Sequence, residues 1–342
     1  MTPSSIIRRR IAVVVPARNA ASLLPGCITS VRAQSMPADE IWIVVGPSCD
    51  RTGSIAQGLA DSTTTVLQNP QGDRGSAINL ALDRSRADLF VLLDAQARLG
   101  PTYIASAVAA LDRSGASVVG GPMRAVGRSA VGRAMAVALR SPFGVGNSQF
   151  HYVGAAREVE SVYLGVYRAS VFERVGRYHT ALLRTEDDDM NARIRDVQLR
   201  IWLDPAIEST YLCRNRLSEI WIQYVGYGYW KVALATRRPN AIRLRHAFPA
   251  AFVLLLIAAG VVSLAAWRPA LPLVAAAYAA AALAAGAVAG VREAFNWALF
   301  PIVTISMHIG YGVGSIVGLA RWRHLRRLVN RPEATRHDGA HD

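Results

Sequence analysis

The chain has 342 residues, 52% of them hydrophobic, and a formal net charge of +14. A soluble nucleic-acid-binding protein would explain the charge but not the hydrophobic content, so we expect no nucleic-acid partner. Apolar residues in lipid and arginines facing anionic headgroups explain both values, which indicates a protein in contact with membrane lipids. Basic residues crowd on either side of the C-terminal apolar runs, at Arg237, Arg238, Arg243, Arg245 and His246 and at Arg321, Arg323, His324, Arg326 and Arg327.

The cysteines and the N-terminal residues are both typical of a chain that is not secreted. Cys27, Cys49 and Cys213 are far apart and match no metal-ligand spacing, so we expect them to be packing residues in a reducing compartment. At the N-terminus, Arg8–Arg10 are followed only by Ile11–Val15 before a proline, and this run is too short for a secretory signal.

Short β-branched runs alternate with helical stretches over residues 11–120. The runs that we expect to form strands are Ile11–Val15, Ile41–Val45, Thr65–Leu67, Leu89–Leu93 and Ser117–Val119. Continuous apolar runs of this kind are typical of parallel strands that are buried on both faces. Between them, apolar residues recur at helical spacing, as around Ile28 and Leu82. The repeated strand–helix–strand pattern predicts an α/β, doubly wound sheet with its ligands at the carboxyl ends of the strands.

The character of the sequence changes after residue 246. Phe248–Trp267 contains no charged residue and is long enough to cross the hydrocarbon core of a bilayer. Ala270–Gly290 is a second such run, and Asn296–Ala320 is a third that also contains polar residues. Glycines at positions 310, 312, 314 and 318 of the third run indicate close packing of helices.

These changes divide the chain into four parts. We expect a catalytic domain over residues 1–215, an amphipathic membrane-interface segment over 216–246, a transmembrane region over 247–320, and a basic, disordered tail over 321–342. Three full crossings would place the basic tail outside, against the positive-inside rule, so either the third segment does not cross or the rule is overridden. We favour a crossing pair with a third segment that is embedded without spanning.

Two groups of carboxylates are candidates for chemistry. Asp94 ends the apolar run at Leu89–Leu93 and so lies at the ligand edge of the sheet, where a carboxylate can hold Mg²⁺ or Mn²⁺ against phosphate oxygens. A turn-forming or helix-capping role explains Asp94 equally well. One carboxylate of Glu186–Asp189 could deprotonate an acceptor hydroxyl, although acids at the start of a helix also stabilise it through the helix dipole.

The order and flanking sequences of these two groups resemble the family-2 glycosyltransferases of the GT-A fold, and the resemblance extends from Val13 to Trp230. The segments that carry it are Val13-Val-Val-Pro16-Ala-Arg-Asn19, Ser48-Cys-Asp50-Arg-Thr52, Asn69-Pro70-Gln-Gly72, Ala77-Ile-Asn79, Asp94-Ala-Gln96 and Glu186-Asp187. It implies a GT-A domain with a Rossmann-like, mostly parallel sheet, followed by interfacial and transmembrane helices.

The resemblance also implies roles for individual residues. A nucleotide-sugar donor, with a UDP-sugar as the first expectation, would be bound by Pro16, Ala17, Arg18, Asn19, Pro47, Asn69, Gly72, Asn79, Asp94 and Ala95. A Mg²⁺ or Mn²⁺ ion would lie on Asp94 and Gln96. Asp187 would be the catalytic base, with Glu186 beside it. Direct displacement with a single base implies inversion at the anomeric carbon.

Three further segments resemble the succinoglycan-type exopolysaccharide glucosyltransferases. They are Ser141-Pro-Phe-Gly-Val-Gly-Asn147, Val162-Tyr-Leu-Gly165-Val-Tyr-Arg168 and Gln223-Tyr-Val-Gly-Tyr-Gly228-Tyr-Trp230. This resemblance implies a multi-pass enzyme of the cytoplasmic membrane, with a cytosolic catalytic domain, that adds a sugar such as glucose to a hydroxyl of a lipid-linked saccharide. Residues assigned to the acceptor and the membrane interface are Gln223, Tyr227, Gly228 and Trp230.

The chain departs from the family pattern at three places. Gln96 stands where histidine is common, and its amide offers a carbonyl oxygen but no charge. Val45-Gly46-Pro47-Ser48 lacks the carboxylate that usually recognises the donor base, so backbone groups near Ala17–Asn19 or Pro47 would recognise uracil, or the nucleotide differs. Gly226 and Tyr227 replace the Arg-Trp pair of processive synthases, which implies one addition per binding event.

Other functions stay open at this stage. A polyprenyl-phosphate glycosyl synthase has an acceptor that is already anionic and needs no base. A catalytically inactive membrane scaffold of the same fold is compatible with the departures at Val45–Pro47 and Gln96. A nucleotidyltransferase is disfavoured because no glycine-rich phosphate loop follows the first strand.

Overall fold

The computed structural model describes residues 9–147, 149–151, 154–290 and 296–330. Its strands are β1 (Ile11–Ala17), β2 (Glu40–Val45), β3 (Thr64–Gln68), β4 (Leu89–Leu92), β5 (Ala97–Leu99), β6 (Val118–Gly121), β7 (Met123–Val126), β8 (Arg157–Glu158), β9 (Tyr163–Arg168), β10 (Ile201–Leu203) and β11 (Ser209–Leu212). Its α-helices are α1 (Leu24–Arg32), α2 (Thr52–Gly58), α3 (Arg74–Arg84), α4 (Tyr103–Ser114), α5 (Ala130–Ala138), α6 (Pro142–Val145), α7 (Ala169–Val175), α8 (Glu186–Asp196), α9 (Leu217–Arg237), α10 (Phe248–Ala265), α11 (Ala270–Gly290), α12 (Leu299–Ala320) and α13 (Trp322–Val329). Short 3₁₀ helices are η1 (Gln149–His151), η2 (Pro239–Ala241) and η3 (Leu244–His246).

The main sheet confirms the predicted α/β architecture. Its strand order is β3-β2-β1-β4-β9-β6-β10-β8, and the first four of these strands run parallel. All five predicted strands are present, as β1, β2, β3, β4 and β6. The strand β9 lies antiparallel between β4 and β6, so the sheet is mixed beyond β4. A second, three-stranded sheet has the order β5-β11-β7.

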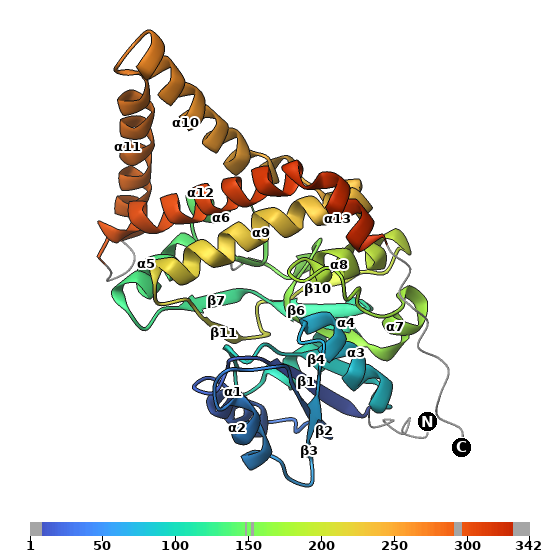
Figure 1. Ribbon diagram of the computed structural model, residues 1–342. Helices are drawn as coiled ribbons and strands as arrows, with labels where there is room; N and C mark the ends of the chain where they lie inside the picture. The colour runs from blue at the N-terminus through green and yellow to red at the C-terminus, as the bar shows by residue number, and fades with distance from the viewer. Residues whose placement is uncertain (1–8, 148, 152–153, 291–295, 331–342) are drawn as a thin grey trace.

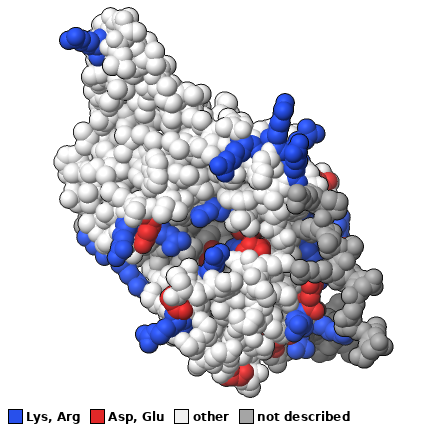
Figure 2. All heavy atoms as spheres, viewed as in Figure 1, with Lys and Arg blue, Asp and Glu red and all other residues white. Residues whose placement is uncertain are grey.

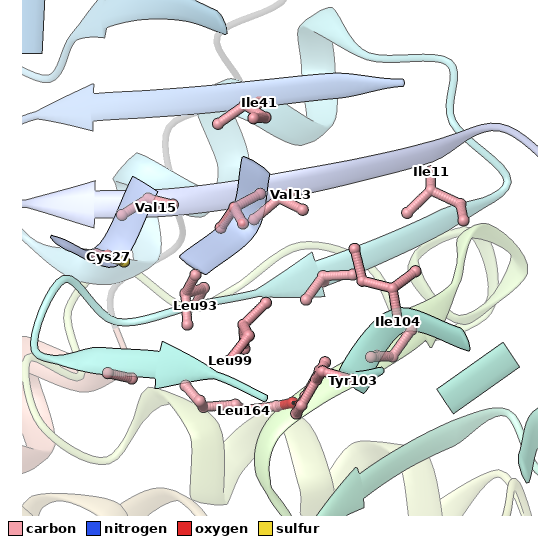
Figure 3. Packing of buried hydrophobic residues seen from close by; sticks show 14 of the residues in the cluster. Ile11, Val13, Val15, Cys27, Ile41, Leu93, Leu99, Tyr103, Ile104 and Leu164 are labelled. Atoms are coloured by element: carbon pink, nitrogen blue, oxygen red, sulfur yellow. Dashed lines mark hydrogen bonds between the residues drawn. The ribbon is translucent and has the colours of Figure 1, made fainter. Parts of the chain in front are cut away.

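Both faces of the main sheet are covered by helices. Along β1, Val13 and Val15 pack into one apolar cluster with α1 and α4, which Figure 3 shows from close by. Ala12 and Val14 point to the opposite face and join a second cluster with α3, α7 and α8. Because successive side chains of a strand alternate between faces, a strand that is apolar throughout requires a helical layer on each side. This arrangement leaves the carboxyl ends of β1, β2, β3 and β4 as the edge available to ligands.

Three C-terminal helices are long and apolar enough to cross a membrane. They differ in how much of each is covered by the protein: 11% of the most apolar window is buried in α10 and in α11, but 44% in α12. In Figure 1, α10 and α11 project from the α/β domain, whereas α12 lies across the top of the domain beside α9. Figure 2 shows that the surface over the projecting pair is almost free of charged side chains.

Glycines bring α12 into backbone contact with α9. A Cβ atom on Gly314 would lie 2.0 Å from the carbonyl oxygen of Val225, and one on Gly228 would lie 2.0 Å from that of Tyr311. Gly310 lies against Trp221 and Gly318 against Val232, so the contacts advance together along both sequences and the two helices run parallel. Close packing was predicted for the glycines of α12 and is confirmed. Gly228, one of the residues assigned to the acceptor and membrane interface, is a contact point between the two helices.

Candidate active site

Four of the residues predicted to bind the donor lie together at the carboxyl ends of β1, β2 and β3. The Arg18 guanidinium donates to the carbonyl oxygen of Pro47 at 3.1 Å and to that of Gly72 at 3.3 Å. Asn19 has a φ of 49° and accepts from the Cys49 backbone N–H at 2.9 Å. Gly72 has a φ of 74°, and a Cβ atom there would lie 2.9 Å from the Pro47 ring. Pro16 and Ala17 end β1 directly before this group.

Two other residues predicted to bind the donor have their side chains engaged within the protein. Asn69 is buried, and its amide donates to the carbonyl oxygen of Asp73 at 2.8 Å. Asn79 exchanges two hydrogen bonds of 2.9 Å with the backbone of Tyr178. In this structure the side chains of both asparagines hold the loop and the helix α3 in place.

The segment Val45–Ser48 lacks the carboxylate that usually recognises the nucleotide base of the donor. The nearest carboxylate after it is Asp50, and its side chain is hydrogen-bonded within the protein. It accepts hydrogen bonds from the backbone N–H groups of Thr52, at 3.0 Å, and Ala21, at 3.1 Å. The hydrogen bond from the Thr52 hydroxyl is the largest of the effects that lower the pKa of Asp50. Asp50 thus closes the loop after β2 against the end of β1, and it does not replace the missing carboxylate.

Asp94 lies in a tight turn between β4 and β5. The turn is closed by a 2.9 Å hydrogen bond from the Ala97 N–H to the carbonyl oxygen of Asp94. Ala95 is buried in the turn, while Asp94 and Gln96 are partly exposed. The turn places the Asp94 carboxylate at the ligand edge, as the sequence predicts.

Arg74, the first residue of α3, joins the two predicted groups of carboxylates. Its Nε lies 3.0 Å from Asp94 Oδ1, and its Nη1 lies 2.7 Å from Asp187 Oδ1 and 3.3 Å from Glu186 Oε1. No local signal in the sequence marks this arginine, because its acidic partners come from the β4–β5 turn and from α8. The sequence analysis therefore missed it. A single guanidinium balances part of the charge of all three carboxylates.

Glu186 and Asp187 occupy different surroundings. The Glu186 side chain is buried, and its Oε2 has no hydrogen-bond partner among the residues that the structure describes, whereas the Asp187 side chain is half exposed. Burial, together with the neighbouring Asp187 charge, raises the pKa of Glu186 to about 8. Burial also raises the pKa of Asp187, but the Arg74 guanidinium lowers it.

The two carboxyls titrate as a pair, and the pair holds its shared proton on the more buried member. With its pKa raised to about 8, Glu186 keeps its proton near neutral pH, whereas the Asp187 side chain is half exposed and contacts Arg74, which lowers the pKa of Asp187. Of the two acids, Asp187 is the one placed to accept a proton.

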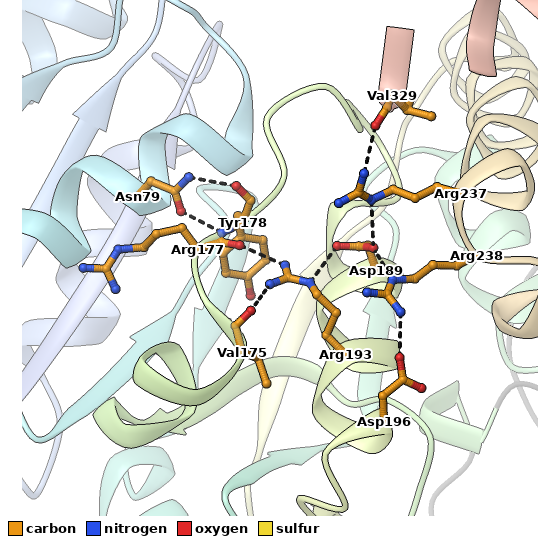
Figure 4. A network of polar contacts seen from close by, with 10 residues as sticks. All are labelled: Asn79, Val175, Arg177, Tyr178, Asp189, Arg193, Asp196, Arg237, Arg238 and Val329. Atoms are coloured by element: carbon orange, nitrogen blue, oxygen red, sulfur yellow. Dashed lines mark hydrogen bonds and ion pairs between the residues drawn. The ribbon is translucent and has the colours of Figure 1, made fainter. Parts of the chain in front are cut away.

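The other two acids of the run have structural partners. Asp188 pairs with Lys231 of α9 at 2.6 Å. Asp189 is fully buried and contacts Arg193 at 2.9 Å and Arg238 at 2.7 Å, within the network shown in Figure 4. The four consecutive carboxylates therefore diverge around the start of α8, since successive residues of a helix are rotated by about 100°.

This network gives a prediction for Asp189. Asp189→Asn should lower the free energy of unfolding by about 3–5 kcal/mol, because it leaves the guanidiniums of Arg193, Arg237 and Arg238 without their buried counter-charge. Asp196→Asn is the matched control: it removes a second, 62% exposed partner of Arg238 and should cost about 1 kcal/mol or less. Thermal unfolding of the detergent-solubilised variants measures both effects. If the two variants unfold at the same temperature, the buried network contributes no more to stability than the exposed ion pair does.

The residues present fit a metal ion that is shared with a phosphate, but not one held by the protein alone. Among residues 9–147, 149–151, 154–290 and 296–330, no three His, Cys, Asp or Glu side chains could together hold a metal. Asp94 offers one carboxylate and Gln96 one carbonyl oxygen. Mg²⁺ is commonly bound by one or two carboxylates together with substrate phosphates and water.

The residues assigned to the acceptor and membrane interface lie on α9, and one of them contacts the start of α8. Gln223 is buried, and its amide donates to the Tyr227 hydroxyl at 2.7 Å. The hydroxyl of Thr185, directly before the acidic run, donates to the carbonyl oxygen of Trp230 at 3.3 Å. Together with the Asp188–Lys231 pair, this contact ties the N-terminus of α8 to α9.

Comparisons with known proteins agree with this fold. A family model described as glycosyl transferase family 2 matches residues 12–176, which include β1, Asp94 and α3. With the GT-A-like fold, the match defines the class: the protein is a glycosyltransferase, and its residues 12–176 match glycosyltransferase family 2. The predicted family and GT-A fold are confirmed.

Two individual proteins are similar over most of the chain. The succinoglycan biosynthesis protein ExoA of Rhizobium meliloti (strain 1021) is 27% identical over 320 residues, which are 92% of this chain and 94% of that protein. The solved structure of the mannosyltransferase PcManGT from Pyrobaculum calidifontis, in complex with GDP-Man and Mn²⁺, has a TM-score of 0.55 and 20% identity. That match covers 90% of this chain and 88% of the mannosyltransferase, and it shows a common fold.

Proposed function

We propose that the protein transfers one sugar from a nucleotide-sugar donor to a hydroxyl of a lipid-linked saccharide in exopolysaccharide biosynthesis, with inversion of configuration. The observation that carries this proposal is the meeting of Asp94 and Asp187 on Arg74, at the edge of the sheet where Arg18 and Gly72 also lie. The similarity to the succinoglycan biosynthesis protein supports the polysaccharide context, and the nucleotide-sugar complex of the mannosyltransferase supports the donor class.

Each side chain has a chemical task in this reaction. The nucleotide would lie between Arg18, Pro47 and Gly72, with its diphosphate directed towards Asp94. A Mg²⁺ or Mn²⁺ ion on Asp94 and Gln96 would neutralise the charge that develops on the leaving diphosphate. Asp187 would take the proton from the acceptor hydroxyl as that oxygen attacks the anomeric carbon.

Arg74 and Glu186 keep the base in its active state. Arg74 contacts Asp187 at 2.7 Å, which fixes the direction of the carboxylate and favours its ionised form. Glu186 holds a proton beside it and so adds no second negative charge. Entry of a donor phosphate next to Asp94 gives the Arg74 guanidinium a new anionic partner.

We further propose that the catalytic domain, residues 1–215, faces the cytosol on the cytoplasmic membrane and is mounted there by α9, within the interface segment 216–246. The helices α10 and α11 would cross as a pair, and α12 would lie embedded beside α9 without spanning. The larger buried share of α12 and its backbone contacts with α9 support this topology. Residues 321–330 leave α12 on the same side as the catalytic domain. They belong to the segment 321–342 that was expected to be disordered, but Trp322–Val329 form the helix α13, and residues 331–342 lie outside the described residues.

The proposed function is tested with the full chain purified in detergent. A panel of UDP-, GDP- and dTDP-sugars is incubated with Mg²⁺ or Mn²⁺, with and without a membrane lipid extract, and released nucleotide is measured. We expect one nucleotide to be released, metal-dependently and faster with the extract. Release from no donor under any condition would favour an inactive scaffold and overturn the proposal.

A further inference from the structure

The basic residues that precede the first apolar run separate into two groups in the structure. Arg237 and Arg238 turn towards α8, where Arg238 contacts Asp189 at 2.7 Å and Asp196 at 2.6 Å. These two arginines therefore balance buried charge inside the protein. Arg243 and Arg245 point elsewhere and line a cavity, so they are the members of the cluster available to a ligand.

This cavity has a volume of about 610 Å³ and lies where the α/β domain meets the start of α10. Three separate segments form it: the loop that ends α6, the residues before β9, and the connection from α9 to α10. Its lining residues are Pro142, Gly146, Asn147, Glu160, Ser161, Arg243, Leu244, Arg245 and Phe248. It is large enough for a phosphorylated headgroup, which is smaller than the drug-sized ligands that cavities of this volume hold.

The polar part of the cavity carries more positive than negative charge. Arg243 pairs with Glu160, and Arg245 donates to the Asn147 side chain at 3.0 Å. Arg195 of α8 donates to the backbone carbonyl of Glu160, which adds a third guanidinium to this region. Burial and the charge of Arg243 lower the pKa of Arg195, while Glu160 raises it. The Arg243–Glu160 pair is about half exposed, and such a pair exchanges easily for a stronger anion.

Two of the lining residues are apolar and exposed, and they lead onto the membrane helices. Leu244 is 77% exposed and Phe248 is 64% exposed at its mouth. The exposed leucines, isoleucines and valines of α10 follow directly from Phe248. A ligand that fills this site has a phosphate group at one end and an apolar tail at the other.

The cavity is also close to the candidate active site. Glu160 is three residues before Tyr163, a distance of about 10 Å at most along the chain. Tyr163 begins β9, and the antiparallel register that places Val91 opposite Val166 brings the start of β9 beside the end of β4, which Asp94 follows. The cavity and the proposed base, Asp187, are therefore close enough for a saccharide attached to a phosphate in the cavity to span the distance between them.

We propose that this cavity binds the phosphate groups of the lipid-linked acceptor through Arg243 and Arg245, with the isoprenoid tail lying along α10. The proposal rests on the proposed function and adds to it the place where the acceptor is held. Confining the acceptor phosphate beside the active site converts the search for an acceptor hydroxyl into a local one.

Farnesyl diphosphate, a short prenyl diphosphate, is the probe. The full chain in detergent is titrated with it, and binding is followed by the rise in Tm. The nucleoside diphosphate released in the donor assay is present in excess, with the metal, so that the donor site cannot take up the probe. We expect Arg243→Gln/Arg245→Gln to weaken probe binding about tenfold or more, because it removes two charged hydrogen-bond donors.

The control pair is Arg323→Gln/Arg326→Gln, which removes the same charge from exposed positions of α13 and should leave the affinity for the probe unchanged. Farnesol, which lacks phosphate, should not raise Tm. Equal loss in the two double variants, or equally tight binding of dihexanoyl phosphatidylglycerol, would overturn the acceptor site. Nucleotide release in the donor assay is read separately: if it persists while the probe fails to bind, only this inference falls and the proposed function stands.

Discussion

Asp187→Asn should lower turnover by about two or more orders of magnitude while donor affinity and Tm stay close to those of the wild type. The amide keeps the size of the side chain but cannot accept the proton of the acceptor hydroxyl. The side chain is half exposed, so the substitution leaves no buried charge unpaired except at Arg74, which retains Asp94 and Glu186. Single-turnover transfer to the lipid extract, together with nucleotide binding, measures the two quantities independently.

The neighbouring acids provide the controls for this result. Asp188→Asn should cost little activity, because Asp188 points to Lys231 of α9 and not to the ligand edge. Glu186→Gln should be intermediate: the neutral amide resembles the protonated acid, but it no longer shares a proton with Asp187. If the three variants lose activity equally and mildly, with lower Tm values, the acidic run only stabilises α8. A polyprenyl-phosphate acceptor would leave Asp187→Asn active, since that acceptor needs no base.

Asp94→Asn should abolish transfer and metal-dependent donor binding together, with activity falling to about 1% or less of the wild type. Asp94 is the only carboxylate of its turn, so the other oxygens around a metal would come from Gln96, the donor phosphates and water. Donor binding measured with and without EDTA tests the assignment. In the variant, the remaining affinity should no longer respond to EDTA.

Arg74→Gln distinguishes a role of Asp94 in metal binding from its role in the ion pair with Arg74. It breaks the same 3.0 Å contact with Asp94 but leaves the carboxylate in place. Donor binding by this variant should be weaker and should remain sensitive to EDTA. An identical response of the two variants to EDTA would mean that Asp94 acts through Arg74 and not through a metal.

The sheet could be predicted from sequence because its strands are buried on both faces. Each of β1, β2 and β4 is almost entirely apolar. At a length of four to seven residues, such a run is typical of a strand buried on both faces of a sheet. The antiparallel insertion of β9 could not be predicted, because its pairing with β4 and β6 joins segments that are distant along the chain.

The carboxylates of the site could be identified from their position after a strand or before a helix, but their partners could not. Arg74 is 20 residues from Asp94 and 113 from Asp187, and only the fold brings these side chains together. The arginines before the first apolar run show the same difficulty. Their spacing indicates a charged edge of the membrane region, yet Arg237 and Arg238 balance acids of α8 while Arg243 lines a cavity.

The glycine contacts between α9 and α12 have a consequence for which acceptors can react. They leave no side chain between the two backbones, so α9 has little freedom to rise or tilt relative to the apolar helices. The start of α8 is tied to α9 through Lys231 and Trp230. In the proposed topology, Asp187 would therefore be held at a fixed height above the membrane surface. A lipid-anchored acceptor would reach Asp187 only with a saccharide of the right length, so the contacts between α9 and α12 would set which acceptor can be extended.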